Sequence, residues 1–205
     1  MRLGIFGGTF DPPHVGHLIL AMEAYDQLKL DKVLWVIAPN PPHKQGKPIT
    51  PIDQRIAMVR TAINADAMFA LSRVDIDRPG PHYVLETMKL LHGSFPNDDL
   101  VFIMGGDSLR DLPNWHEPQR FVEQCSNIGV MRRPGEVIDL SLLVDQLPGI
   151  DKKVEFIDAP LLEISSNKIR ALAYQKKPFR YYLPPGVYDQ IITLGLYNTE
   201  DSLKE

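Results

Sequence analysis

Short apolar runs bounded by turn residues alternate along this chain with longer stretches in which apolar residues recur at helical spacing. The runs predict strands over residues 2–6, 32–38, 69–76, 100–104, 127–131 and 154–157. The helical spacing predicts helices over residues 15–28, 51–63, 83–91, 117–124, 167–174 and 184–194. Because strands that alternate with helices form successive βα units, we predict an α/β fold with a doubly wound parallel sheet.

Ligands of open parallel sheets bind outside the carboxyl ends of the strands, where loops lead into helices. The loops in question span residues 7–17, 39–50, 77–82, 105–116 and 132–135. They hold most of the histidines and glycines of the chain. We therefore predict the functional site at this edge of the sheet.

Composition and charge narrow the class of protein. The 205 residues, 44% apolar and 23% charged, are typical of a soluble globular chain. We find no linker and no repeat, so we expect a single domain over residues 1–205, with residues 160–205 as its C-terminal helical part. No apolar run approaches the roughly 20 residues that span a bilayer. With a net charge of −4, the chain has no positive field that would draw it to nucleic acid or to an anionic membrane.

Cysteine usage indicates the compartment. Cys125 is the only cysteine, which excludes an intrachain disulfide and a cysteine-cluster metal site. A chain without disulfides fits a reducing environment, so we expect a cytoplasmic protein. The sequence gives no indication of the oligomeric state.

The segment from Gly7 to His17 reads Gly-Gly-Thr-Phe-Asp-Pro-Pro-His-Val-Gly-His and joins a predicted strand to a predicted helix. Backbone amides and the positive end of the helix converge there, which predicts a phosphate site. The segment contains neither G-x-G-x-x-G nor G-x-x-x-x-G-K-[ST], the two commoner nucleotide motifs. A different nucleotide-binding fold is therefore indicated.

His14 and His17 lie three residues apart, so one helical turn places both side chains on the same side. Two histidines at this spacing also occur as helix-capping or core residues, or as part of a zinc site. We do not favour zinc, because no third ligand lies nearby in a helical register and a glycine-rich loop precedes the pair. The setting favours a shared anionic ligand.

Together with Ile-Ser-Ser-Asn-Lys-Ile-Arg over residues 164–170, this string resembles the nucleotidyltransferase superfamily with its HxGH and ISSTxIR motifs. Residues 42–44, 78–83 and 105–116 are similar to the bacterial nicotinate-nucleotide adenylyltransferases, in the same order along the chain. The resemblance implies a Rossmann-like nucleotidyltransferase fold. It also implies the joining of ATP and nicotinate mononucleotide, with release of pyrophosphate and with Mg²⁺ bound to the ATP.

The resemblance also implies roles for individual residues. The residues implied in catalysis are His14, His17, Lys44 and Arg170, with His17 as the first choice for the essential one. The residues implied in ATP binding are Gly8, Thr9, Phe10, His14, His17, Gly106, Asp107, Ser108, Ser165, Ser166 and Arg170. The residues implied in mononucleotide binding are Thr9, Lys44, His82, Tyr83, Val84, Trp115 and Arg133.

Simpler interpretations stand beside several of these roles. Ser165 and Asp107 are residue types that often cap helices. A lone Trp115 is more often part of a core than a ring contact, and Lys44 and Arg133 taken alone are typical of solvated loops. The nearest alternative function is the same transfer onto another phosphate such as phosphopantetheine, and a further one is a regulator that binds nucleotide without turnover.

The sequence departs from the family pattern at two places. Where the family usually has Ser-Tyr-Thr and then Asp, this chain has His82, Tyr83, Val84 and Glu86. We expect a preference for nicotinate over nicotinamide, with His82 as a candidate replacement for the lost hydroxyl donor. The family's Thr in the late motif is Asn167 here.

Overall fold

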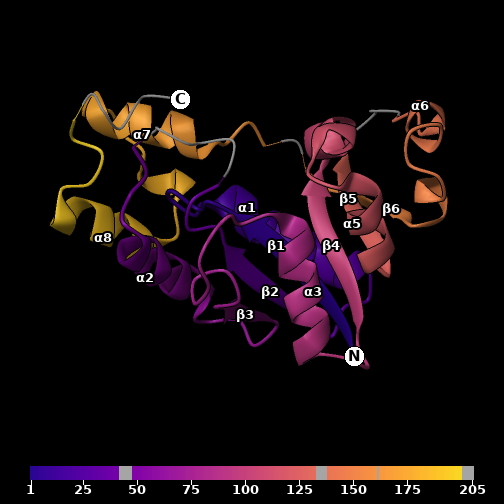
Figure 1. Ribbon diagram of the computed structural model, residues 1–205. Helices are drawn as coiled ribbons and strands as arrows, with labels where there is room; N and C mark the ends of the chain where they lie inside the picture. The colour runs from indigo at the N-terminus through magenta and orange to yellow at the C-terminus, as the bar shows by residue number, and fades with distance from the viewer. Residues whose placement is uncertain (42–47, 133–137, 161, 200–205) are drawn as a thin grey trace.

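The computed structural model describes residues 1–41, 48–132, 138–160 and 162–199 (Figure 1). Within them, six strands form one sheet in the order β3-β2-β1-β4-β5-β6, and every neighbouring pair is parallel. The strands are β1 (Arg2–Gly8), β2 (Lys32–Ile37), β3 (Phe69–Ser72), β4 (Asp99–Gly105), β5 (Asn127–Arg132) and β6 (Val154–Asp158). The predicted doubly wound sheet is confirmed, and its strand order reverses between β1 and β4.

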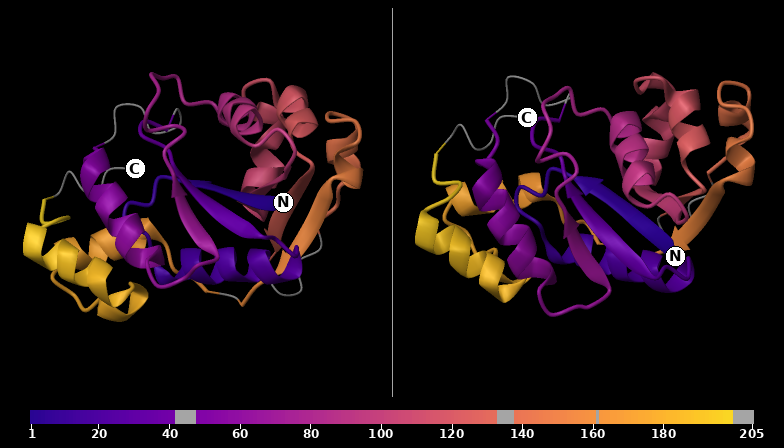
Figure 2. Two further views of the ribbon diagram at one scale, coloured as in Figure 1. Left: turned by 90° about the horizontal axis from the view of Figure 1, so that it is seen from below. Right: turned by 60° about the horizontal axis from the view of Figure 1, so that its bottom comes forward.

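Helices cover both faces of the sheet (Figure 2). One face carries α1 (Val15–Gln27), α2 (Ile52–Ile63), α7 (Ser166–Tyr174) and α8 (Pro185–Leu194). The other face carries α3 (Val84–Ser94), α4 (Gly106–Asp111), α5 (Pro118–Gln124) and α6 (Ser141–Val144). Three short 3-10 helices complete the described elements: η2 (Leu112–Asn114), η3 (Ile150–Lys152) and η4 (Arg180–Tyr182).

The strands form because their side chains alternate between two separate cores. In β2, Val33, Trp35 and Ile37 face the first core, whereas Leu34 and Val36 face the second. A strand buried on both faces reads as a continuous apolar run, which is what the sequence shows. The two cores therefore share one sheet.

A glycine permits the close packing of the segment after α1. A Cβ at Gly129 of β5 would lie 2.5 Å from Cδ1 of Leu28, the residue that ends α1. A side chain there would require Leu28 to shift, so glycine lets the end of this helix approach the sheet.

The main differences from the prediction concern one strand and two short helices. The strand predicted over residues 69–76 ends at Ser72, because the last register pair with β2 is Val36 with Ser72 and the chain then turns. The helices α4 and α6 were not predicted, since runs of 6 and 4 residues are too short to show helical periodicity. Among the described residues, no helix is long and apolar enough to cross a membrane.

Candidate active site

His14 and His17 lie together at the start of α1. The backbone N–H of His14 donates to Nδ1 of His17 over 3.1 Å, and the two rings stack with centroids 3.6 Å apart and planes 24° apart. Because Nδ1 of His17 accepts this hydrogen bond, a neutral His17 carries its proton on Nε2. Nε2 is therefore the nitrogen that donates to a ligand.

Burial sets the charge of both imidazoles. Desolvation lowers the pKa of His14 to about 4. Desolvation also lowers the pKa of His17 well below its usual 6.5, and the charge of a protonated His14 would lower it further. At pH 7 the pair is neutral, so each ring serves as a hydrogen-bond donor and gains a proton only when an anion beside it offsets the burial.

Two small residues allow the rings to take these positions. A Cβ at Gly16 would lie 3.1 Å from Nδ1 of His14, which is tighter than most real contacts. A Cβ at Gly8 would lie 2.8 Å from the ring of Phe10, which folds back over it. Phe10 is buried in the core and packs edge-on against His17, so its ring forms the floor of the pair, and its role in ATP binding stays a prediction.

The late motif contacts the early loop directly. Ser166 Oγ donates to the carbonyl oxygen of Pro12 over 2.8 Å, and Nη1 of Arg170 donates to that of Asp11 over 2.9 Å. Nη2 of Arg170 donates to Oδ1 of Asn167 over 2.7 Å. Residues about 154 to 159 positions apart in sequence thus meet, and Arg170 is buried where they do.

Ser165 takes the capping role that the sequence left open. Its Oγ accepts from the backbone N–H of Lys168 over 3.2 Å and caps α7. A cap leaves the other free N–H groups of the first turn pointing out of the helix, where the helix dipole favours an anion. This end of α7 faces the same space as the histidine pair.

That space is a cavity of about 370 Å³. Its walls come from the start of α1, the end of β5 and the segment that leads from β6 into α7. They comprise His14, Gly16, His17, Ile19, Leu20, Met131, Arg132, Ala159, Pro160, Leu162, Ile164, Ser165 and Ser166. The structure therefore brings His14, His17, Ser165 and Ser166 together around one cavity.

The remaining predicted ATP contacts lie at the strand-order reversal. Gly8 is the last residue of β1 and Thr9 follows it, whereas Gly106 to Ser108 begin α4 after the neighbouring β4. Asp107 makes no capping hydrogen bond, its side chain is 81% exposed, and it accepts from Arg110 over 2.5 Å. Its carboxylate is open to a ligand at this edge.

Trp115 packs against the second core, and its contact with a substrate ring stays a prediction. Its ring packs against Phe102 and Phe121, with centroids 6.2 and 5.5 Å away, and it remains half-buried. Nearby, Tyr83 stacks on the exposed ring of His116, with centroids 4.1 Å apart. Aromatic surface from two loops thus gathers beside α3 and α4.

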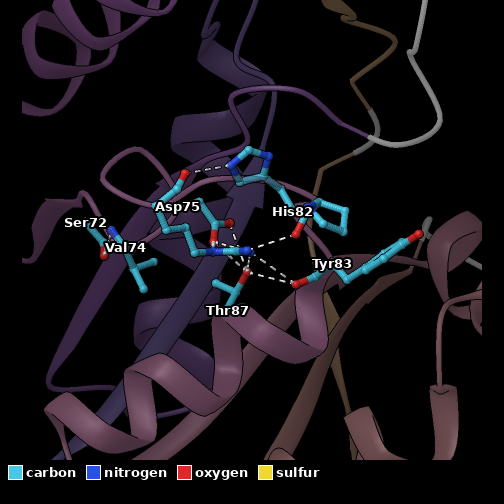
Figure 3. A network of polar contacts seen from close by, with 8 residues as sticks. Ser72, Val74, Asp75, His82, Tyr83 and Thr87 are labelled. Carbon is cyan, nitrogen blue, oxygen red and sulfur yellow. Dashed lines mark hydrogen bonds and ion pairs between the residues drawn. The ribbon is translucent and has the colours of Figure 1, made fainter.

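A buried polar network holds the loop that leads into α3 (Figure 3). Both carboxylate oxygens of Asp75 lie 2.9 Å from Oγ1 of Thr87, and Oδ1 also accepts from Nε of Arg78 over 2.8 Å. Nη1 of Arg78 donates to the carbonyl oxygen of Pro81 over 2.9 Å. Asp75 and Thr87 are almost fully buried, so this network fixes the loop before Tyr83.

His82 belongs to the same loop and faces inward. Its ring packs over Gly80, and Nε2 lies 3.3 Å from the carbonyl oxygen of Arg78 (Figure 3). With only 8% of the residue exposed, the imidazole serves the loop. This placement argues against the suggestion that His82 replaces the lost hydroxyl. Val84 begins α3 beside it.

Two predicted site residues, Lys44 and Arg133, lie outside the described residues, so their roles stay predictions. Within the described part of the chain, no group of three or more His, Cys, Asp or Glu side chains is placed to hold a metal ion. Cys125 is buried, and burial raises the pKa of its thiol to about 12.

Arg55 is a site-organising residue that the sequence reasoning missed. It is 1% exposed and donates to the backbone carbonyl oxygens of the loops around the histidine pair. These acceptors, at 2.8 to 3.0 Å, are Thr9, Ala38, Pro39 and Thr50. An arginine inside the apolar stripe of α2 was the signal available in the sequence.

The sequence of this chain is similar to those of known nucleotidyltransferases. A model of the cytidylyltransferase-like family matches residues 5–172. A relative from Thermomicrobium roseum, named probable nicotinate-nucleotide adenylyltransferase, is 44% identical over 202 residues, which cover 98% of this chain and 94% of the relative. A relative of the same name from Thermus thermophilus is 39% identical and covers 96% and 100%.

A solved structure shows the same fold. The nicotinic acid mononucleotide adenylyltransferase of Plasmodium falciparum, complexed with NaAD, matches with a TM-score of 0.80 at 22% identity. The match covers 96% of this chain and 97% of that one. The likeness therefore extends over nearly the whole chain.

Proposed function

This chain belongs to the cytidylyltransferase-like family and, within it, to the nicotinate-nucleotide adenylyltransferases, and from this membership we propose that it joins ATP and nicotinate mononucleotide. The products are nicotinate adenine dinucleotide and pyrophosphate, a step of NAD biosynthesis. The observation that carries the proposal is the cavity at which the histidine pair meets the late motif.

The reaction needs alignment and positive charge rather than a covalent nucleophile. An oxygen of the mononucleotide 5′-phosphate attacks the α-phosphorus of ATP, the new P–O bond forms, and the bond to the β-phosphate oxygen breaks. Pyrophosphate leaves with that electron pair. Because two polyanions meet, positioning and electrostatic stabilisation supply most of the rate increase.

We assign the α-phosphate to the histidine pair. Nε2–H of His17 donates to a phosphate oxygen, and His14 stacks against the same ring. Negative charge grows on the phosphates as pyrophosphate leaves, so a donor aimed there binds the transition state more tightly than the ground state. The same charge raises the depressed imidazole pKa values and favours protonation in the complex.

We assign the other phosphates and a ribose hydroxyl to the late motif and to the remaining predicted residues. The first turn of α7 and Arg170 are assigned to the β- and γ-phosphates, and Asp107 to a ribose hydroxyl. Lys44 and Arg133 are assigned to phosphate of the mononucleotide. We propose that Mg²⁺ enters as part of the MgATP substrate, where phosphate oxygens and water would suit its octahedral preference.

The pyridine ring is assigned to the aromatic surface beside α3 and α4. The exposed part of Trp115 offers a stacking face, and Tyr83 borders it. Backbone amides around Val84 are the remaining candidates for the nicotinate carboxylate, since the family hydroxyl is absent and His82 faces its own loop.

The experiment is a pyrophosphate-release assay with MgATP and each acceptor in turn. Nicotinate mononucleotide is expected to give pyrophosphate and the dinucleotide in equal amounts, and nicotinamide mononucleotide much less. Product with phosphopantetheine alone would select the alternative transferase. Binding of ATP without product from any acceptor would indicate a regulator that binds nucleotide without turnover.

We also propose a cytoplasmic location, on the ground that the only cysteine of the chain is a free, buried thiol. Residues 1–205 are proposed to work as one domain, with residues 160–205 as the helical part that carries the second phosphate motif. The contacts of Ser166 and Arg170 with the early loop support this unity.

A further inference from the structure

Asp11 lies at the centre of a buried polar cluster, three residues before His14 along the chain. Its Oδ1 accepts from the hydroxyl of Tyr197 over 2.7 Å, and its Oδ2 accepts from the backbone N–H of Thr50 over 3.1 Å. Its carbonyl oxygen accepts from Arg170 over 2.9 Å. Asp11 is 5% exposed, so these partners replace the water that a carboxylate would otherwise bind.

Tyr197 comes from the far end of the chain, after α8. It is 5% exposed, and its hydroxyl donates to a residue 186 positions earlier. Burial and the neighbouring Asp11 hold the pKa of the phenol well above 10, so the hydroxyl keeps its proton and remains a donor. The family model matches residues 5–172, so Asp11 lies within the matched part of the chain and Tyr197 lies beyond it.

The backbone of Tyr197 is held in an uncommon conformation. Its φ of 64° lies in the left-handed region, which a bulky side chain rarely adopts. Such a conformation persists only where the surroundings over-determine it, and it clusters at functional sites. Here α8 docks on α2 through Gln190 and Thr61, which places the following turn against Asp11.

Asp11 stands three residues before His14, on the loop that sets the position of both imidazoles. We propose that Tyr197, acting through Asp11, is a positioning residue for His14 and His17, so that the segment after α8 is a working part of the active site. The proposal rests on the proposed function for its catalytic consequence. The contact between Tyr197 and Asp11 is a property of the folded chain and does not depend on the proposed function.

The substitution Tyr197→Phe tests this because it removes the hydroxyl and keeps the ring in the core. We expect kcat with MgATP and nicotinate mononucleotide to fall between about tenfold and a hundredfold, as for a small misplacement of a reacting group. The KM for the mononucleotide is expected to stay within about twofold, since its pyridine ring is assigned to the surface beside α3 and α4. Tyr188→Phe, on α8 against Phe179, is the matched control and should retain wild-type kcat.

A double-mutant cycle separates positioning from general support of the fold. If Tyr197 acts only through Asp11, then the double variant Tyr197→Phe with Asp11→Ala, which removes the acceptor oxygen, should lose no more kcat than Asp11→Ala alone. Losses in kcat that multiply would overturn the proposal. A folded Tyr197→Phe enzyme with a lower melting temperature and an unchanged kcat would overturn it as well.

A spectroscopic readout keeps this test independent of the reaction. The imidazole resonances of His14 and His17, assigned by His→Gln variants, should shift in Tyr197→Phe and stay in place in Tyr188→Phe. If the wild-type protein makes no dinucleotide, the proposed function fails while the shifts still decide the positioning. Unchanged resonances in Tyr197→Phe would refute it.

Discussion

At the residue scale, the two ring nitrogens of His17 have different hydrogen-bonding roles. Nδ1 accepts from the backbone of His14, so Nε2 alone is available to a phosphate. We predict that His17→Ala lowers kcat by about 10²–10³-fold, the usual loss for one transition-state donor. His17→Gln, which places a donor near the position of Nε2, should recover part of the loss.

Steady-state kinetics on both variants, with circular dichroism and thermal unfolding as checks of the fold, make the measurement. The loss should appear in kcat more than in either KM, because the donor acts mainly in the transition state. A folded His17→Ala enzyme with wild-type kcat would remove His17 from the mechanism.

His14 links the same site to stability. Its pKa is about 4 in the folded chain and about 6.5 when unfolded, so below pH 6.5 the unfolded chain binds more protons. Its contribution is therefore complete above pH 6.5 and is lost as the pH falls toward 4. We predict that this group alone lowers the free energy of unfolding by about 2 kcal/mol between pH 7.5 and 5.

Urea unfolding at pH 7.5 and pH 5 measures this loss. His14→Asn cannot titrate in this range, so it should show a smaller fall in the free energy of unfolding than the wild-type chain. Equal falls in the two proteins would show that His14 is not the group responsible. Carboxylates contribute little to the comparison, since most are ionised at both pH values.

At the element scale, α2 is tied to the loops of the site by one side chain. Arg55 satisfies four carbonyl oxygens with its guanidinium, and burial lowers its pKa without removing its charge. We predict that Arg55→Met costs about 2–4 kcal/mol, because it leaves buried carbonyl groups unpaired. Arg60→Met, at an exposed position of the same helix, should stay within about 0.5 kcal/mol.

Chemical denaturation of the two variants decides this, with kcat as a second readout. Arg55→Met should also reduce kcat, since Thr9 belongs to the loop that precedes the histidines. Equal stability of Arg55→Met and Arg60→Met would mean that water satisfies those carbonyls equally well.

The same scale shows what a sequence can predict here. Apolar periodicity predicted all six strands because apolar side chains of each strand pack against both cores, and it predicted the long helices because each has one apolar stripe. The pattern did not predict α4 and α6, because these helices are too short to show helical periodicity. It predicted β3 to extend into the following turn, because apolar residues of that turn pack against the cores without pairing to β2.

In the candidate site too, local features could be predicted from the sequence and long-range contacts could not. The motifs around His14 and Ser165 are local strings, so the sequence could predict that they share a ligand. The contacts of Arg55, Asp75 and Tyr197 could not be predicted, because each polar side chain finds its partner only when distant segments fold together. Ser165 and His82 differ from these residues, because each makes a polar contact with a residue only three or four positions away.

At the scale of the whole molecule, the two cores lie on opposite faces of one sheet and share its strands. Trp35 lies in the first core, and Trp115 packs against the second. These are the only two tryptophans in the chain, so each core carries one natural fluorescent probe. We predict that both probes report the same urea midpoint, because breaking either core exposes strands that the other requires.

The measurement uses Trp115→Phe to isolate Trp35 and Trp35→Phe to isolate Trp115, each compared with far-ultraviolet circular dichroism of the same variant. The comparison is made within each variant, since both substitutions change packing and shift the absolute midpoint. Fluorescence and circular dichroism should coincide in both proteins. A fluorescence midpoint that precedes the dichroism midpoint in one variant alone would show that its core unfolds first, and residues 1–205 would then be two cooperative units sharing a sheet.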